Sequence, residues 1–479
     1  MPALVVQTVT ARSMAELRAA RDAASGDMVE LRVDGVADLD VAGALAGRTK
    51  PVIFTCRAAW EGGRFDGDEA TRLSLLARAI QLGAEYVDVE WRADRRGLPV
   101  NPDTVIVLSH HDFSCTPGDL EDRIAAMASE QPDVLKIAVT AHRLSDAVQL
   151  RDATRLDIPH VAISMGRSGH LSRACPRLFG SLWTYGGTAA PGQLSVADLI
   201  DVYRVGEQSD STALYAVAGA PLAHSASPAM HNAAFAASGI DAVYALLDTD
   251  DAAELLRACE AFGVSGASVT APLKTGACAL VTDRDDLAMR TGSVNTMRRD
   301  GNVWAGRNFD VAGFLSPFER RHEDLAGTRC VVLGAGGAAR TALWALQSKG
   351  AQVEVSARRE DRARELAGEF GAAVSAWPPA PGWDLLVNTT PVGTWPEVDA
   401  VPVDADAVRG RAVYDLIYNP EETALLRVAH RAGAETIGGL EMLVGQACLQ
   451  FEWWTGRTAP RDVMVEAARR FLRNKQVFA

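Results

Sequence analysis

The sequence predicts an α/β fold that opens with a closed (β/α)8 barrel. Eight short β-rich runs occur in roughly the first two hundred residues, with helical patterns between most of them, and this alternation indicates parallel βαβ units. An open doubly wound sheet is the alternative for this region. The polar stretch 206–212 then breaks the rhythm and indicates a linker, after which two further α/β units follow.

The expected barrel strands are, in chain order, Leu4–Val9, Met28–Val33, Pro51–Cys56, Tyr86–Glu90, Thr104–His110, Val134–Val139, His160–Met165 and Leu182–Gly186. Helix starts are visible between them. Ser13 and Glu16 form a capping-box pattern, residues 68–82 carry apolar side chains at helical spacing, and Pro117 is expected at the first position of another helix.

Composition excludes several classes of protein. The chain has 48 Lys and Arg against 61 Asp and Glu, a net charge of −13 that argues against a general nucleic-acid binder. Its seven cysteines show neither a C-x-x-C pair nor metal-ligand spacing, so we expect reduced thiols and no metal site. The sequence shows neither a basic leader nor a long uncharged apolar run, so we expect no membrane span and a cytoplasmic protein.

Lysine is rare in this chain: only five of the 48 Lys and Arg residues are lysines. A lysine in an unusual setting therefore indicates chemistry that arginine cannot perform, since a guanidinium stays protonated and is a poor nucleophile. Lys136 lies in the middle of the apolar run Val134–Val139. We expect burial to lower the pKa of Lys136 and free its amine to form a Schiff base. A purely structural pairing with Asp or Glu is the alternative.

Other charged side chains gather where the expected strands end. Glu30, Arg32 and Asp34 share one face of their strand, near the end at which barrels carry active sites, and an edge strand with a solvent-exposed face is the alternative. His110 and His111 end the fifth strand on opposite faces, so periodicity does not choose between them.

Six motifs in order carry a resemblance to a known family: E-L-R-V-D (30–34), T-C-R-A-A-W-E-G-G (55–63), S-H-H-D-F (109–113), L-K-I-A (135–138), M-G-R-S-G-H-L-S-R (165–173) and A-P-G-Q (190–193). Together they resemble type I 3-dehydroquinate dehydratases over about residues 3–205. The resemblance implies that Lys136 forms an imine with the substrate ketone. It further implies that His111, assisted by Glu61, abstracts the adjacent proton and then protonates the departing hydroxyl.

The same resemblance implies a set of residues that hold the substrate hydroxyls and carboxylate: Glu30, Arg32, Arg57, Arg173 and Gln193. For Arg57 and Glu61, a surface ion pair is the alternative. The sequence departs from the family at Ala189, where serine is usual, so we expect a weaker grip on the substrate unless Thr188 supplies the hydroxyl.

A dinucleotide fingerprint opens the third unit. A β-rich run leads into glycines and alanines that begin a helical run, and these are Gly334, Ala335, Gly336, Gly337, Ala338 and Ala339. The next strand ends without an acidic residue for a ribose hydroxyl and runs instead into Arg358 and Arg359, with Arg362 one turn later. This cationic end favours a 2′-phosphate, so the predicted cofactor is NADP rather than NAD, although an accidental cluster is possible in an arginine-rich chain.

Several further segments resemble shikimate dehydrogenase over about residues 213–475: S-A-S-P (225–228), S-V-T-A-P-L-K (268–274), N-F-D (308–310), N-T-T-P-V-G (388–393), Y-D-L-I-Y-N-P (414–420) and G-G-L-E-M-L-V-G-Q (438–446). The resemblance implies a two-lobed α/β dehydrogenase with a Rossmann-type NADP domain. It implies Lys274 and Asp310 as the catalytic pair, for which a plain salt bridge is the alternative.

The resemblance also implies the binding residues of this half. The hydroxylated ring and its carboxylate would be held by Ser225, Ser227, Thr270, Asn295, Tyr418 and Gln446. The nicotinamide side would be lined by Leu416, Gly439 and Met442. The sequence departs from the family at Phe309, where threonine is usual, at Ala357, where asparagine is usual, and at Thr394, where methionine is common. Phe309 lies beside the expected catalytic aspartate and leaves the preferred ring substrate open, whereas Ala357 would loosen contacts with the adenosine.

The sequence therefore predicts a fused, bifunctional enzyme of the shikimate pathway that makes aromatic amino acids. The first half would dehydrate 3-dehydroquinate to 3-dehydroshikimate, and the second would reduce this ketone to shikimate with NADPH. Quinate as the preferred acid of the second half, and a catalytically reduced sensor, remain alternatives. The expected domains are 1–205, a linker 206–212, a substrate domain 213–322 completed by 436–479, and a NADP domain 323–435. The expected partners are these small molecules, and no oligomeric state is predicted.

Overall fold

The computed structural model describes residues 2–189 and 192–477, with only the backbone for 475–477. The chain forms two compact units. Residues up to 228 together with 240–280 make the first, and residues 229–239 together with those from 281 onward make the second. The first two residues of the A-P-G-Q motif lie outside the described residues.

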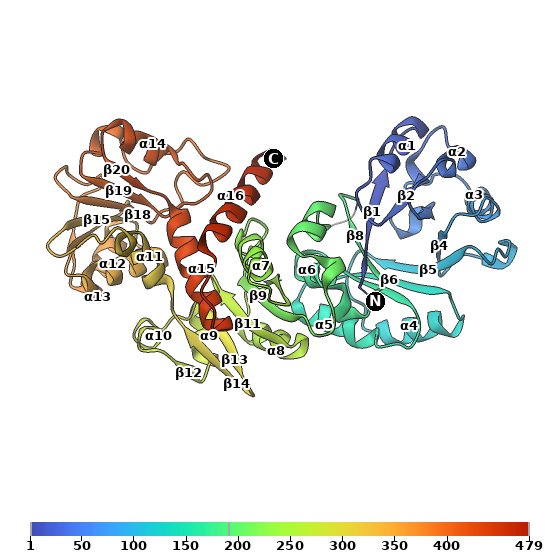
Figure 1. The fold of residues 1–479 in the computed structure, drawn as a ribbon, viewed down its shortest axis with the longest axis horizontal. Helices are drawn as coiled ribbons and strands as arrows, with labels where there is room; N and C mark the ends of the chain where they lie inside the picture. Colours follow the sequence, from blue (N-terminus) through green and yellow to red (C-terminus); the bar gives the residue numbers. More distant parts are fainter. Residues whose placement is uncertain (1, 190–191, 478–479) are drawn as a thin grey trace. The chain divides into compact units, whose positions relative to one another are not determined.

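The first unit opens with eight parallel strands, β1 Leu4–Thr10, β2 Met28–Arg32, β3 Val52–Thr55, β4 Tyr86–Glu90, β5 Val105–Asp112, β6 Val134–Thr140, β7 His160–Met165 and β8 Trp183–Gly186. Their order is β7-β6-β5-β4-β3-β2-β1-β8. Where β7 meets β8, the Leu182 N–H donates to His160 O (3.0 Å) and the Ala162 N–H donates to Ser181 Oγ (2.9 Å). The predicted barrel is confirmed, and the open sheet is excluded (Figure 1).

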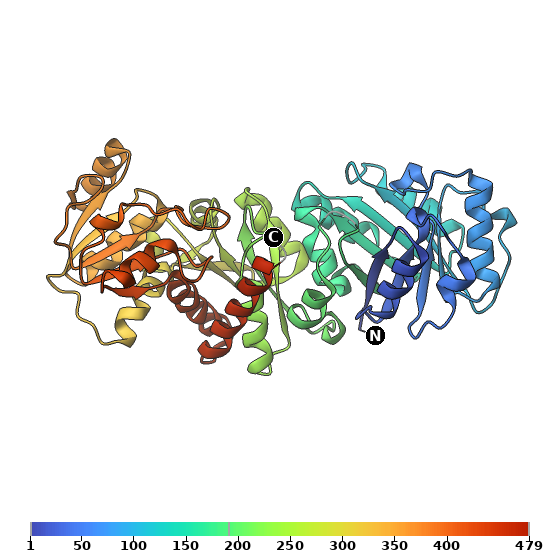
Figure 2. The ribbon, with the colours of Figure 1, turned by 90° about the horizontal axis from the view of Figure 1, so that it is seen from above.

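Helices surround these strands (Figures 1 and 2), namely α1 Met14–Asp22, α2 Val41–Leu45, α3 Glu69–Gln81, α4 Leu120–Ser129, α5 Leu144–Ala153 and α6 His170–Ala174. Ser13 caps α1 by accepting from the Glu16 N–H, as expected. The prediction that Pro117 begins a helix is wrong. α4 begins at Leu120, because the residues from Pro117 form a turn in which the Leu120 N–H donates to Pro117 O (3.2 Å).

The interior of the barrel changes character along the strands. Towards their amino ends, the inward side chains are apolar and include Met28 and Val134. Two residues later on the same strands, the same face carries Glu30 and Lys136, which are also buried. Buried charges are costly unless they are paired, so the carboxyl end of the barrel must be a polar network rather than a continuation of the core.

The first unit continues with three parallel strands in the order β10-β9-β11, namely β9 Ala213–Gly219, β10 Ala242–Asp248 and β11 Val264–Val269. Their helices are α7 Ser227–Ala237, which continues into the second unit, α8 Ala252–Phe262 and α9 Lys274–Leu280. α8 packs on the barrel, where Phe262 lies 5.7 Å from Phe179 between ring centroids and the Ser145 N–H donates to Glu254 (3.2 Å).

The second unit begins with β12 Asp283–Arg284, α10 Asp286–Thr291, β13 Thr296–Asp300, β14 Val303–Arg307 and α11 Asp310–Arg320. A parallel sheet follows in the order β17-β16-β15-β18-β19-β20, from β15 Arg329–Leu333, β16 Gln352–Ser356, β17 Ala373–Val374, β18 Leu385–Asn388, β19 Ala412–Asp415 and β20 Glu435–Ile437. The strand order reverses beside β15, as in a Rossmann-type domain, so that prediction is confirmed.

Helices cover both faces of this sheet (Figure 1): α12 Gly337–Ser348, α13 Glu360–Phe370 and α14 Ala424–Arg431. α12 and α13 share one apolar cluster with Val332 and Val355, whereas α14 shares another with Val331 and Val413. The last helices are α15 Gly439–Thr455 and α16 Arg461–Val477. In the described part of the chain, we find neither a helix long and apolar enough to cross a membrane nor a metal-binding group of His, Cys, Asp or Glu.

Candidate active sites

A cavity of about 90 Å³ lies in the barrel, and all eight residues predicted for the first reaction line it. They come from strands or loops spread through the barrel sequence and are Glu30, Arg32, Arg57, Glu61, His111, Lys136, Arg173 and Gln193. Parallel strands of a barrel bring their carboxyl ends to one mouth, which explains how residues so far apart in sequence meet.

Lys136 is buried at the floor of this cavity, but it is not a free amine. Its Nζ donates to Asp88 Oδ2 (2.9 Å) and Glu30 Oε1 (3.4 Å), and lies 4.4 Å from the centroid of the Tyr185 ring. Desolvation lowers the pKa of Lys136, but the two carboxylates outweigh it and raise the pKa above its usual value. The expectation of a lowered pKa is therefore wrong for the substrate-free protein.

The carboxylates belong to a buried charge network that sequence reasoning missed. Asp88 Oδ1 pairs with Arg57 (2.9 Å), and Glu90 pairs with Arg57 (3.0 Å) and with Arg72 of α3. Arg57 is therefore not in a surface ion pair. Asp88 and Glu90 alternate along β4 as Glu30 and Arg32 do along β2, so the same period-two pattern was available to identify them.

His111 and Glu61 form the second polar pair of the cavity. His111 Nδ1 lies 2.9 Å from Glu61 Oε2, and the ring stacks on Phe113 at 6.1 Å. Desolvation and the nearby cation of Arg57 lower the pKa of His111 to about 4, although the hydrogen bond to Glu61 opposes this. At neutral pH the imidazole is thus uncharged. With Nδ1–H donating to the carboxylate, Nε2 is left as the basic nitrogen.

The ambiguity between the two histidines has a geometric answer. His110 does not line the cavity, yet its Nδ1 lies 3.2 Å from the other oxygen of Glu61. Its Nε2 lies 3.2 Å from Arg123 of α4. Glu61 therefore joins both histidines, and only His111 is placed at the cavity.

The other residues expected to bind anionic and hydroxyl groups, Arg32, Arg173 and Gln193, also line the cavity. Arg32 is held by Asp34 through two hydrogen bonds (2.8 and 3.0 Å). Burial lowers the pKa of Arg173 to about 10, so its cation favours an anion nearby. Gln193 Oε1 accepts from the backbone N–H of Ala189 (2.6 Å), the position where the family usually has serine.

Tyr185 is a further cavity residue that sequence reasoning did not single out. It is 4% exposed, and burial raises the pKa of its hydroxyl to about 12. Its only sequence signal is a polar aromatic residue on an inward-facing position of β8, in register with Val6.

For the second reaction, three predicted residues of the second unit converge. Asn295 Nδ2 donates to Asp310 Oδ1 (2.8 Å) and to Gln446 Oε1 (3.0 Å). Asn295 Oδ1 accepts from the Phe309 N–H (2.9 Å), so the asparagine holds both the aspartate and the turn before it. Asp310 begins α11 and is 7% exposed. Tyr418 follows β19, and burial raises the pKa of its hydroxyl.

The other predicted residues belong to the first unit, at the carboxyl ends of β9 and β11. The loop after β9 carries Ser225, whose Oγ accepts from the Ser227 N–H (3.3 Å). A Cβ on Gly219 would lie 2.4 Å from Thr270 Cγ2, so these two loops touch. Lys274 begins α9 and is half-buried. The pairing of Lys274 with Asp310 stays a prediction.

The glycine-rich turn after β15 fits a dinucleotide pyrophosphate. Gly336 is the N-cap of α12, and no side chain caps the first turn among the described residues. A Cβ on Gly336 or Gly337 would meet nothing within 4 Å, whereas one on Gly334 (φ +109°) would lie 2.7 Å from Thr389 Oγ1. The open glycines expose backbone N–H groups at a helix N-terminus, which is the anion-binding arrangement of this fold.

Three arginines follow β16, as predicted. All three are exposed, and Arg362 is in addition paired with Glu365 (2.8 Å) on its own helix. Ala357, at the position of the family asparagine, packs against the apolar core of the domain. Arg358 and Arg359 are thus better placed than Arg362 to meet a phosphate.

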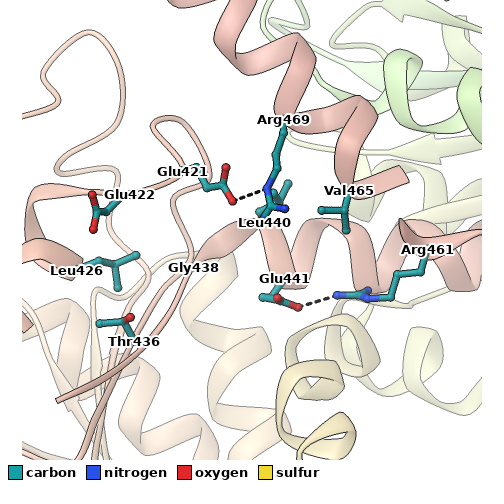
Figure 3. Close-up of a pocket in the computed structure, with 10 residues that line it drawn as sticks. All are labelled: Glu421, Glu422, Leu426, Thr436, Gly438, Leu440, Glu441, Arg461, Val465 and Arg469. Carbon is teal, nitrogen blue, oxygen red and sulfur yellow. Dashed lines mark hydrogen bonds and ion pairs between the residues drawn. The ribbon is translucent and has the colours of Figure 1, made fainter. Parts of the chain in front are cut away.

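The residues expected on the nicotinamide side lie where β19 ends and α15 begins. A Cβ on Gly439 would lie 2.3 Å from Leu416 O, so only glycine allows this approach, and Met442 lies one turn further along α15. A neighbouring cavity of about 200 Å³ is lined by other residues, with the pairs Arg469–Glu421 (2.8 Å) and Arg461–Glu441 (2.6 Å) at its sides (Figure 3).

Comparisons with known proteins give one consistent result. Residues 4–210 match type I 3-dehydroquinase, residues 217–297 the shikimate dehydrogenase substrate-binding domain, and residues 439–469 the shikimate 5′-dehydrogenase C-terminal domain. The chloroplastic bifunctional 3-dehydroquinate dehydratase/shikimate dehydrogenase of Arabidopsis thaliana is 34% identical over 477 residues, covering 91% of this chain and 79% of that protein.

Two further relatives match the second half alone. The shikimate dehydrogenase (NADP(+)) of Moorella thermoacetica is 43% identical over 273 residues, 53% of this chain and 92% of that protein. The structure of shikimate 5-dehydrogenase from Thermus thermophilus, in complex with NADP(H) and shikimate, superposes with a TM-score of 0.51 at 37% identity over 54% of this chain and 99% of that one. The chain belongs to the family of bifunctional 3-dehydroquinate dehydratase/shikimate dehydrogenases.

Proposed function

We propose that the chain catalyses two consecutive reactions, the dehydration of 3-dehydroquinate to 3-dehydroshikimate and the NADPH-dependent reduction of this ketone to shikimate. The observation that carries the proposal is the meeting of Lys136, His111 and Glu61 in one cavity with the predicted carboxylate- and hydroxyl-binding residues. NADP is the proposed cofactor, supported by the open glycine turn, the exposed Arg358 and Arg359, and the relatives that use it.

In the barrel, Lys136 would attack the substrate ketone once its ammonium has lost a proton. The amine and ketone then form an imine with loss of water, and the protonated imine again places a positive charge beside Asp88 and Glu30. These carboxylates therefore stabilise the cation both before and after the bond forms.

His111 would take the proton from the carbon next to the imine through Nε2, leaving an enamine. The same imidazolium then gives its proton to the departing hydroxyl, which leaves as water, and hydrolysis of the imine returns Lys136. Glu61 holds the Nδ1–H and compensates the charge that His111 gains during the transfer.

In the second reaction NADPH, when bound, supplies hydride to the ketone carbon. Lys274 and Asp310 would donate the proton that the carbonyl oxygen requires, with Asn295 orienting the Asp310 carboxylate. Ser225, Ser227, Thr270, Tyr418 and Gln446 would hold the ring and its carboxylate, and Leu416, Gly439 and Met442 would line the nicotinamide side.

The domain limits and the cellular compartment are part of the proposal. The limits 1–205, 206–212, 213–322 with 436–479, and 323–435 are supported by β8 ending at Gly186, β9 beginning at Ala213 and β15 beginning at Arg329. A cytoplasmic location is supported by the seven cysteines, which all lie in the described part of the chain and are free thiols. The Arabidopsis relative is chloroplastic.

The decisive experiment supplies 3-dehydroquinate and NADPH together and follows NADPH oxidation and shikimate formation. The wild-type chain should form shikimate, Lys136→Ala should form none from dehydroquinate but still reduce added dehydroshikimate, and Lys274→Ala should accumulate dehydroshikimate. No turnover of either substrate, with binding retained, would instead support a sensor. Loss of both activities in either variant would contradict two separate sites.

A further inference from the structure

Asp415 is a buried acid that the mechanism above does not use. It ends β19 at the carboxyl edge of the Rossmann-type sheet and is 0% exposed. Burial raises the pKa of this carboxyl to about 6. An ionised carboxylate in such a place is unfavourable unless hydrogen bonds compensate it, so its partners indicate what it does there.

The carboxylate receives three hydrogen bonds from three different segments. Oδ1 accepts from Asn388 Nδ2 (2.9 Å) and from the Ile417 backbone N–H (3.1 Å), and Oδ2 accepts from Thr423 Oγ1 (2.6 Å). Asn388 ends β18, Ile417 lies in the loop after β19, and Thr423 is the N-cap of α14. All three donors are neutral, so the contacts act through geometry rather than through an ion pair.

The first contact extends to the glycine turn. Asn388 Oδ1 accepts from both the N–H and the hydroxyl of Thr390 (3.0 and 2.7 Å), which orders the loop after β18. The preceding Thr389 donates to Leu333 O (2.6 Å), and its Oγ1 is only 2.7 Å from the position that a Cβ on Gly334 would take. The loop held by Asp415 through Asn388 thus forms one wall of the proposed pyrophosphate cradle.

The second contact extends to the proposed nicotinamide side. The Leu416 N–H donates to Asn388 O (3.0 Å), and the Gly439 N–H donates to Ile417 O (3.2 Å). The backbone from Leu416 to Ile417 is therefore clamped between Asp415 and the start of α15. Further along the same loop, Glu421 pairs with Arg469 of α16 (Figure 3).

We propose that Asp415 is a positioning residue for the second reaction, because it holds the loops after β18 and β19 together at the place where the cofactor is expected to lie. The inference rests on the proposed NADPH-dependent activity and adds a residue that touches neither the substrate nor the cofactor. A carboxylate suits this role because it offers only acceptors to three converging donors. An amide of the same shape keeps an oxygen for two of them and can donate to the Thr423 hydroxyl.

The test compares Asp415→Ala with Asp415→Asn, using NADPH affinity from fluorescence titration, KM and kcat of the reduction, and the dehydratase rate of the same chain. Asp415→Ala should weaken NADPH binding by about tenfold or more, since displaced backbone alone can cost this much, while Asp415→Asn stays within about threefold. Asp384→Ala is the matched control. Asp384 accepts from the Arg329 N–H (2.9 Å) and joins the amino ends of β15 and β18, whereas Asp415 lies at the carboxyl end of its strand.

Hydrogen exchange separates local loosening from unfolding. In Asp415→Ala, added exchange should be confined to residues 388–393 and 416–420, with β15, β16 and α12 still protected. If Asp415→Ala does not melt cooperatively, Thr423→Val is compared with Thr423→Ser. Valine removes both the donor to Oδ2 and the oxygen that caps α14 by accepting from the Leu426 N–H, whereas serine keeps both, so only the valine variant should weaken NADPH binding.

Three outcomes overturn the proposal: wild-type NADPH affinity in a folded Asp415→Ala, equal losses in the alanine and asparagine variants, or unchanged affinity in Thr423→Val where the alanine variant is unfolded. A wild-type chain that neither binds NADPH nor reduces dehydroshikimate would refute the NADPH-dependent function itself. If the wild type binds NADPH without reducing dehydroshikimate, the comparison of NADPH affinity between the variants still tests the role of Asp415.

Discussion

The Lys136 ammonium is bound to the Asp88 carboxylate at 2.9 Å, and Asp88 is bound in turn to Arg57 at 2.9 Å. The proposed nucleophile is thus held as a cation before substrate arrives. The network that holds it also orients an arginine expected to bind substrate. Asp88 therefore affects two residues at once, because it stabilises the charge of Lys136 and holds Arg57 in position.

The imine can be trapped. Borohydride added with 3-dehydroquinate should reduce the imine and attach the substrate irreversibly to Lys136, because this amine faces the cavity that gathers the binding residues. Peptide mass spectrometry locates the adduct. Lys50, whose ammonium donates to the backbone oxygens of Ala24 and Gly26, is the internal control and should stay unmodified. An adduct on another lysine would remove Lys136 from its proposed role.

Removing the carboxylate of Asp88 should lower the pKa of Lys136. Asp88 and Glu30 raise this pKa against the effect of desolvation, so Asp88→Asn removes the nearer of the two opposing charges. The rate of Lys136 acetylation by a small reagent should then rise at a lower pH than in the wild type. Lys349, paired with Glu319 at the surface, serves as the reference and should not change. An unshifted profile for Lys136 would show that Asp88 does not control the charge.

His111, the proposed general base of the dehydratase, should stay unprotonated well below neutral pH. A histidine whose pKa is lowered binds its proton only at lower pH, so His111 stays neutral until the pH approaches about 4. Because Lys136 must also lose its proton, kcat/KM should fall gradually below the pKa of that lysine and turn more steeply downward only near the pKa of His111, rather than near 6.5, as measured by pH jump before the protein unfolds. Glu61→Gln removes a contact that raises the pKa of His111. It should move the steeper fall to a still lower pH and reduce kcat by roughly a hundredfold or more, because the imidazole loses its orienting partner.

Much of this arrangement was available from the sequence, and the reasons are physical. The alternation of β-rich runs with helical patterns predicted the barrel, because a βαβ unit buries one apolar stripe of each helix and both faces of each strand. Glu30 and Arg32 were expected on one charged face because alternate positions of a strand lie on the same side, whereas the expectation that Asp34 shares this strand is wrong, since β2 ends at Arg32 and Asp34 lies in the 3-10 turn that follows. The same pattern runs through Asp88 and Glu90, which were overlooked because no expected motif contained them.

The errors arose where the outcome depends on distant partners. The pKa of Lys136 is set by Asp88 and Glu30, which lie 48 and 106 residues away in the sequence, and burial alone predicts the opposite direction. Pro117 is a favourable first residue for a helix, yet its carbonyl accepts from Gln149 of α5 and from the Leu120 N–H. Local preference gave way to a tertiary contact. Asp415 lies in the Y-D-L-I-Y-N-P motif, but the sequence does not indicate its role, because two of its three donors, Asn388 and Thr423, lie outside that motif.

Cofactor preference should depend on two arginines rather than three. Arg358 and Arg359 are exposed at the end of β16, whereas Arg362 is engaged by Glu365. Replacing both Arg358 and Arg359 by alanine should weaken NADPH binding by about tenfold to a hundredfold, the loss expected for charge-assisted contacts to a phosphate. NADH binding should change little. Arg364→Ala, on the helix α13 that follows these arginines and paired there with Glu360, is the control. Equal weakening of both cofactors would contradict a 2′-phosphate site.

Phe309→Thr restores the residue that the family usually carries beside Asp310, and it should change stability more than specificity. The Phe309 ring packs edge-on against Trp453 at 5.9 Å, and Trp453 in turn stacks with the guanidinium of Arg298 at 4.7 Å. Loss of this aromatic contact should lower the free energy of unfolding by about 1 kcal/mol.

The link between Phe309 and Asp310, the proposed catalytic acid, runs through the backbone of Phe309, whose N–H donates to Asn295 Oδ1, and threonine supplies the same donor. Asn295 therefore continues to hold Asp310, and kcat should stay within about threefold, because orientation of the acid is retained. The ratio of kcat/KM for shikimate and quinate, measured in the oxidative direction on wild type and variant, checks this. A reversal of that ratio in Phe309→Thr would show that the ring itself faces the substrate and selects between the two acids.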